Sequence, residues 1–88
     1  MALLKMISDR WNKKHFETLQ EGNRDVSKAK KLEEFGCLQK AVVRYESARL
    51  NFKKAKGFAT LLRNEEYKAK AQMEIEQVEE VIQLFKWR

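Results

Sequence analysis

The strongest constraint on the fold is a regular stripe of small and apolar residues between positions 38 and 55. The residues recur at steps of three and four, at Leu38, Ala41, Tyr45, Ala48, Phe52 and Ala55. This spacing places side chains along one side of an α-helix. Alanines on that side allow another helix to approach closely beside the two large rings. We therefore expect a helix over residues 38–56 that is buried along this stripe.

The remaining composition favours helices throughout. The 88 residues include no proline and only three glycines, and β-branched residues are too scattered for a sheet. A chain of this length corresponds to one domain. We therefore predict an all-α fold, an antiparallel bundle of three to four helices in a single domain spanning residues 1–88.

The expected helices cover residues 2–20, 26–35, 38–56 and 60–86. Gly22 with Asn23 is predicted to stop the first helix, and Gly57 to end the third, because glycine suits the left-handed position after a helix. Gly36 is expected in a tight turn, the alternative being one long helix whose phase drifts there. Asp25 or Ser27 would cap the second helix.

The two end helices carry their own apolar sides. Thr60 or Asn64 would cap the last helix, with Glu65 and Glu66 in its first turn. Its apolar side follows helical steps through Tyr67, Ala71, Ile75 (or Glu74), Val78, Ile82 and Phe85, and Val81 and Leu84 widen the end of this side. The first helix aligns apolar side chains with the lone histidine, at Leu4, Ile7, Trp11, His15 and Leu19. This side is expected to pack either on the chain itself or on a partner.

The central hairpin carries a recognisable pattern. The series Gly36-x-Leu38-x-x-Ala41-x-x-x-Tyr45-x-x-Ala48 resembles the second helix of a tetratricopeptide repeat. A single such hairpin followed by one long helix is similar to a microtubule-interacting-and-trafficking (MIT) domain, whose third helix would correspond to residues 62–85. The resemblance implies a three-helix bundle that binds a short helical or extended peptide in a groove beside its last helix.

The residues that catalysis and metal binding require are scarce. The sequence has one histidine, His15, and one cysteine, Cys37, so metal motifs built from paired ligands cannot form. No glycine-rich phosphate loop occurs, and adjacent glutamates such as Glu79 and Glu80 point apart on a helix. We expect a protein that is not an enzyme, has no metal or cofactor, and works inside the cell, where a lone thiol stays reduced.

Positive charge is concentrated in the middle of the chain. Residues 24–63 contain 11 lysines and arginines against 4 acidic residues, within a total net charge of +6. We expect a basic patch at Lys40, Arg44, Arg49, Lys53, Lys54 and Lys56. Ser47 and Asn51 are expected beside Lys40, Arg44 and Lys54, on the side opposite the core. Nucleic-acid binding by this patch is the alternative function, and membrane-surface binding by the first helix is a weaker one.

The favoured function is non-catalytic protein–protein interaction, as an adaptor that binds a partner helix or peptide. The expected contact residues follow the groove between helices 38–56 and 60–86: Ala71, Met73, Ile75 and, near the end, Trp87. Homodimerisation stays open, because short amphipathic helices leave apolar faces uncovered.

Overall fold

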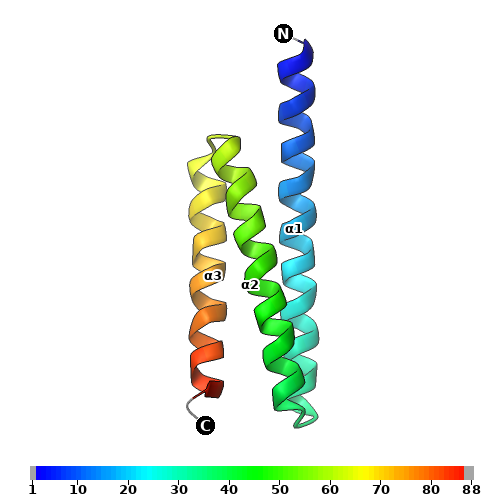
Figure 1. Cartoon of the computed structure of the whole chain (residues 1–88), viewed down its shortest axis with the longest axis vertical. Helices are drawn as coiled ribbons and strands as arrows, with labels where there is room; N and C mark the ends of the chain where they lie inside the picture. Colours follow the sequence, from blue (N-terminus) through cyan, green and yellow to red (C-terminus); the bar gives the residue numbers. More distant parts are fainter. Residues whose placement is uncertain (1, 87–88) are drawn as a thin grey trace.

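Three α-helices form an up-down-up bundle in the computed structural model, which describes residues 2–86. They are α1 (Ala2–Glu34), α2 (Leu38–Leu61) and α3 (Glu65–Lys86). The central helix α2 packs on both of the others and runs antiparallel to each (Figure 1). Residues 2–86 contain no β-strand. The prediction of an all-α bundle is confirmed, with three helices.

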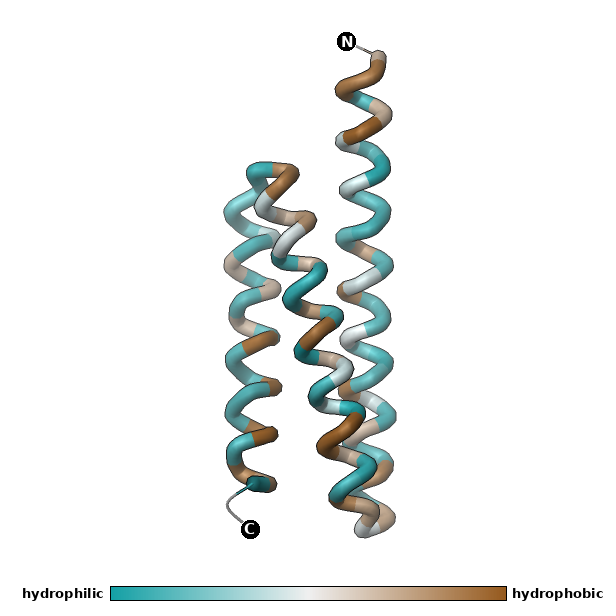
Figure 2. The backbone as a smooth tube through the Cα atoms, viewed as in Figure 1, coloured by the Kyte–Doolittle hydropathy of each residue, from teal (hydrophilic) through white to brown (hydrophobic). Residues whose placement is uncertain are grey.

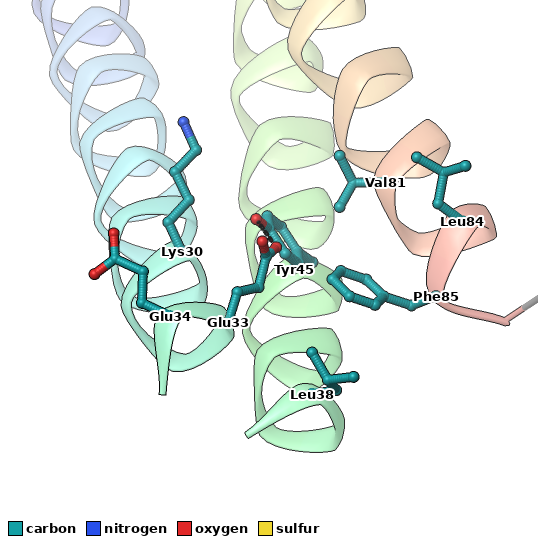
Figure 3. A pocket seen from close by; sticks show the side chains of 8 residues that line it. All are labelled: Lys30, Glu33, Glu34, Leu38, Tyr45, Val81, Leu84 and Phe85. Atoms are coloured by element: carbon teal, nitrogen blue, oxygen red, sulfur yellow. Dashed lines mark hydrogen bonds between the residues drawn. The ribbon is translucent and has the colours of Figure 1, made fainter. Parts of the chain in front are cut away.

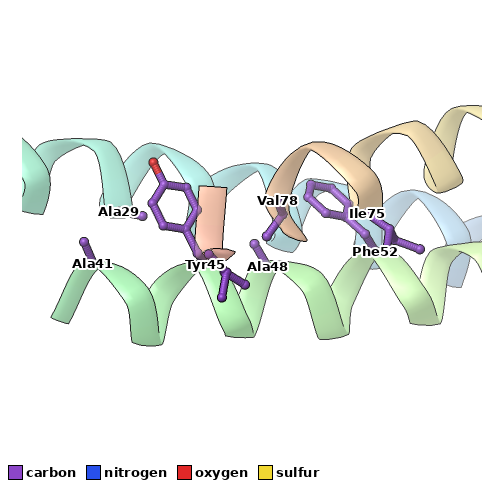
Figure 4. Packing of buried hydrophobic residues seen from close by; sticks show 8 residues of the cluster. Ala29, Ala41, Tyr45, Ala48, Phe52, Ile75 and Val78 are labelled. Atoms are coloured by element: carbon purple, nitrogen blue, oxygen red, sulfur yellow. The ribbon is translucent and has the colours of Figure 1, made fainter. Parts of the chain in front are cut away.

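The core lies along α2. Ala41, Tyr45, Ala48, Phe52 and Ala55 are all buried, as the stripe predicts, whereas Leu38 at its start is 43% exposed. The same buried side continues to Ala59. Ala29 of α1 and Ile75, Val78 and Ile82 of α3 complete the core cluster (Figure 4). Alanines without exposed surface bring the backbones close together, so two large rings and three aliphatic side chains fill the remaining space.

The predicted stop at Gly22-Asn23 is wrong, because the two expected helices over residues 2–20 and 26–35 are one continuous helix that ends at Glu34. Gly22 is buried in the middle of α1, against the ring of Phe52. A Cβ atom at this position would lie 2.5 Å from Phe52 Cε1, closer than any ordinary contact. Gly22 therefore provides space for an aromatic ring of α2 and does not end the helix.

The α1–α2 turn and the α2–α3 turn have the same backbone hydrogen-bond pattern. At each, an amide bonds to the carbonyl five residues earlier, Cys37 to Leu32 and Asn64 to Ala59, and the preceding amide bonds three residues back. This pattern is the Schellman motif, which places one residue in the left-handed region. Gly36 takes that position in the first turn, with φ +77°, so the predicted turn is confirmed.

Arg63, not a glycine, takes the left-handed position of the second turn, with φ 55°. The predicted helix end at Gly57 is therefore wrong, as are the bounds 38–56 and 60–86, since α2 continues to Leu61 and α3 begins at Glu65. Of the two predicted caps, Asn64 is the one used. Its Oδ1 accepts a hydrogen bond from the Tyr67 amide at 3.1 Å.

A buried carboxylate fixes α1 against α2. Asp25 Oδ2 accepts hydrogen bonds from Ser47 Oγ at 2.8 Å and from Asn51 Nδ2 at 3.0 Å. Asp25 Oδ1 lies 3.6 Å from Arg44 Nη1. The predicted role of Asp25 as a helix cap is wrong, and so is the placement of Ser47 and Asn51 opposite the core. A buried carboxylate needs these partners, so the cluster specifies how the two helices align.

Gly22 and Gly57 both lie inside helices, so they make a matched test of the contact with Phe52. We expect Gly57→Ala to raise the free energy of unfolding by roughly 1 kcal/mol, because Gly57 is in a helix with nothing within 4 Å of its added Cβ. Gly22→Ala adds the same methyl group against a buried ring, where overpacking costs about 1–3 kcal/mol. Urea denaturation should give Gly22→Ala a lower free energy of unfolding than the original protein. Equal stabilisation by both changes would contradict the contact.

The second turn predicts a stabilising change. Arg63→Gly removes a left-handed non-glycine residue, a conformation that costs about 1–2 kcal/mol, although glycine also gives the unfolded chain more freedom. We expect a net gain of roughly 0.5–1 kcal/mol, measured by thermal and urea unfolding. Arg63→Ala is the control, because it removes the same side chain but keeps the strain. If alanine stabilises as much as glycine, the backbone explanation is wrong.

Candidate functional site

A groove lies between α1 and α3, floored by the first turns of α2. We call it the α1–α3 groove. It has a volume of about 620 Å³ and is lined by Lys30, Glu33, Glu34, Leu38, Tyr45, Val81, Leu84 and Phe85 (Figure 3). It lies at the end of the bundle that contains the first turn.

The two walls of the groove differ in chemistry. The α3 wall is apolar and consists of Val81, Leu84 and Phe85, of which Leu84 is 59% exposed. The α1 wall is charged and carries Lys30, Glu33 and Glu34. An apolar wall facing a mainly acidic one suits an amphipathic segment with a cationic edge.

Tyr45 holds the floor of the groove in place. Its hydroxyl donates a 2.5 Å hydrogen bond to Glu33 Oε1, and its ring stacks on Phe85 with centroids 6.1 Å apart. Burial, followed by the hydrogen bond and negative charge of Glu33, raises the pKa of Tyr45 far above its ordinary value of 10. The phenol therefore stays protonated and connects all three helices, which is a structural role.

The predicted partner-binding residues do not form one surface. Ala71 and Ile75 are buried between α3 and α2, so a partner reaches them only by displacing α2. Met73 is exposed, and Trp87 lies outside the described residues. Sequence periodicity identified the packing side of α3. The groove wall, with Leu84 exposed and Val81 and Phe85 half-buried, lies at the edge of that side. The widening of the apolar side at Val81 and Leu84 is its signal in the sequence.

The six predicted basic residues also separate. By helical spacing, Lys40, Arg44 and Lys54 follow the α1 edge of α2, and Arg49, Lys53 and Lys56 follow the α3 edge. The exposed residues Val43 and Leu50 lie between the two rows.

Two of these cations have partners within the chain, and a third lies near acidic residues of α3. Arg44 is paired with Asp25, and Lys56 Nζ donates to Gln72 Oε1 at 2.6 Å. Arg49 shares a surface depression with Glu76, Glu79 and Glu80 of α3. Lys40, Lys53 and Lys54 are exposed. The structure therefore offers no continuous six-residue patch to a phosphate backbone.

At the opposite end of the bundle, α1 and α3 meet through aromatic rings. His15 is 2% exposed and stacks on Tyr67, with centroids 4.6 Å apart, while Phe16 contacts both rings edge-on. The Nδ1 atom of His15 is buried without a hydrogen-bond partner. Burial, followed by the positive charge of Lys70, lowers the pKa of His15 below its ordinary value of 6.5. His15 is therefore a packed neutral side chain that favours contact between α1 and α3.

This burial predicts a pH dependence of stability. In the unfolded chain His15 binds its proton near pH 6.5, and in the folded chain only at lower pH, so unfolding takes up a proton in the interval between. The contribution of His15 to the free energy of unfolding should be complete above about pH 6.5. It should fall as the pH drops towards the pKa of His15 in the folded chain. Urea denaturation of the original protein and of His15→Phe, between pH 7.5 and 5.5, measures the effect. If the free energy of unfolding changes with pH equally in both proteins, His15 does not cause the pH dependence.

Other chemical sites are not evident in residues 2–86. This part of the chain holds no group of three or more histidine, cysteine or acidic side chains arranged for a metal ion. None of its three helices has the length and apolar character needed to cross a bilayer. Comparison with protein-family models, curated proteins and solved structures gives no match to this chain.

Proposed function

We propose that this chain is a non-catalytic interaction module that binds a helical or extended segment of a partner protein in the α1–α3 groove. The observation that carries the proposal is the apolar wall of α3, where Leu84 is 59% exposed beside half-buried Val81 and Phe85. Exposed apolar side chains that line a groove are typical of sites for partner segments.

The chemistry of the groove specifies the partner segment. Apolar residues at steps of three or four would pack on Leu84 and Phe85, as in other helix-in-groove complexes. A lysine or arginine at the edge of the segment would face Glu34, which is exposed on the α1 wall. The interaction would depend on a few apolar anchors, with charge setting orientation and specificity.

The resemblance to the MIT domain supports the same class of function. The hairpin pattern that carries the resemblance, from Gly36 to Ala48, forms the turn and the buried side of α2. The proposed groove lies beside the last helix, as the resemblance implies, but on its α1 side. The α2 side expected from the sequence is filled by Ala71 and Ile75.

Two leucines of nearly equal exposure test the groove. Leu84 in the groove is 59% exposed and Leu50 on the outer side of α2 is 57% exposed. Segments selected from a displayed library of helical peptides would be measured against the original protein, Leu84→Glu and Leu50→Glu by titration calorimetry. We expect Leu84→Glu to weaken binding at least about tenfold, as loss of an anchor does, and Leu50→Glu to leave it unchanged.

The alternative function has its own outcome. If the basic middle of the chain binds nucleic acid, affinity for duplex or single-stranded oligonucleotides should fall steeply with salt and with Lys40→Glu plus Lys54→Glu. Equal peptide binding by both leucine variants, together with such salt-dependent nucleic-acid binding, would replace the proposed function with that alternative.

A further inference from the structure

The first turns of α1 extend beyond the rest of the bundle. Tyr67, the third residue of α3, stacks on His15, and α1 and α3 run in the same direction (Figure 1). The start of α3 is therefore level with about residue 13 of α1. Residues 2–11, which we call the projecting segment, continue roughly 15 Å past the α2–α3 turn at a rise of about 1.5 Å per residue.

This segment carries an apolar stripe that is only partly covered, since Ile7 and Trp11 are half-buried and Leu4 is exposed. Leu4, Ile7 and Trp11 lie at helical steps in line with His15 and Gly22, which are buried against the other helices. Leu4 is 72% exposed, and the flanking Leu3 is 69% exposed. Figure 2 shows hydrophobic residues at this end of α1, beyond the reach of the other two helices. The core-facing side of α1 therefore continues for about three turns without α2 or α3 against it.

The projecting segment and the end of the hairpin meet at an open corner, which we call the notch. The side of α1 that α2 and α3 cover farther along is open beside the projecting segment. The α2–α3 turn closes the notch at one end, with Leu61 52% exposed, Leu62 half-buried, and the carboxylates Glu65 and Glu66 exposed. The notch thus combines an apolar wall with an apolar and acidic end.

We propose that the projecting segment of a second copy of this chain fills the notch, in an antiparallel dimer with two-fold symmetry. A parallel pair would drive the second α1 into the hairpin, because both stripes face the side on which α2 and α3 lie. In the antiparallel pair the second α1 runs away from the first hairpin. Both stripes are then covered at once, and the contact closes at two copies.

The charges agree with this arrangement. In the antiparallel pair, the first turn of one copy lies level with the α2–α3 turn of the other. Lys5 of one copy then approaches the Glu65 and Glu66 carboxylates of its partner, and the reverse contact forms at the other end. Opposite charges at both ends favour this register over a shifted one.

The shape of the notch argues against a flat membrane as its occupant. An interfacial helix presents its apolar side to the bilayer along its whole length. Here the hairpin stands on that same side, so the stripe cannot meet a bilayer without immersing Glu65 and Glu66. A rod-like helix fits the notch, and the second copy supplies one with a complementary stripe.

Sedimentation equilibrium of the full chain, from low to high micromolar concentration, tests the dimer. We expect the mass of the original protein to rise to twice the monomer value. Leu4→Glu with Ile7→Glu should hold the mass at one copy, while unfolding of the dilute protein stays unchanged. Met6→Glu is the matched control, because Met6 is 68% exposed on the same segment but lies on the opposite side of the helix. It should dimerise as the original protein does.

Charge variants test the antiparallel register. Lys5→Glu and, separately, Glu65→Lys with Glu66→Lys should each weaken self-association by several-fold, and an equimolar mixture of the two proteins should restore it as a mixed dimer. A monomer at every concentration would overturn the proposal. Equal loss of self-association in the Met6 variant and in the Leu4 and Ile7 variant would overturn it too, as would a mixture of the charge variants that does not recover self-association. Binding of phosphatidylserine vesicles by a protein that does not dimerise would also overturn it.

Discussion

The contact between Gly22 and Phe52 determines much of the architecture. Phe52 has no exposed surface, and its ring occupies the space that any larger residue at position 22 would need. The absence of a side chain on α1 therefore lets α2 approach with a full aromatic ring between the two backbones. Buried alanines on either side of the ring maintain the same close approach along α2. The packing of α1 on α2 thus follows from one large residue and several small ones.

The two interfaces of α2 are specified by different interactions. Against α1, the buried carboxylate of Asp25 requires Ser47, Asn51 and Arg44 at fixed positions, so a shift along the helix axis would leave a charge unpaired. Against α3, the core cluster is aliphatic and aromatic, with Ile75, Val78 and Ile82 packed on α2. Apolar packing is less directional, and the position of α3 is also supported at its ends, by His15 with Tyr67 and by Tyr45 with Phe85.

The sequence predicted the buried stripe of α2 and the Gly36 turn correctly, because both depend on local periodicity and backbone conformation. It failed at Gly22 and Gly57, where glycine is compatible with a helix end and equally with a helix interior. Only the position of Phe52 distinguishes these cases for Gly22, and that position is set by tertiary packing. Arg63 carried no signal, because a left-handed residue other than glycine is imposed by the two helices that it joins.

The candidate site was predictable to a similar extent. Helical spacing identified the side of α3 that packs, but not which of its residues another helix would cover. Ala71 and Ile75 fell inside the interface, and Leu84 remained at its edge. Ser47 and Asn51 were misplaced because a solvent-exposed polar side and a side that satisfies a buried carboxylate look alike in sequence. Pairing with Asp25 is a long-range contact, separated by more than twenty positions along the chain.

The continuity of α1 at Gly22 also determines what can cover its first turns. A helix that ended at Gly22 would free residues 2–20 to fold back and place Leu4, Ile7 and Trp11 on the bundle as a fourth helix. The helix is continuous over its 33 residues, so these side chains stay in line with the core-facing side of α1 and do not fold back onto the bundle. Leu4 therefore stays exposed in this fold. The same glycine that admits Phe52 thus leaves the apolar end of α1 available for association.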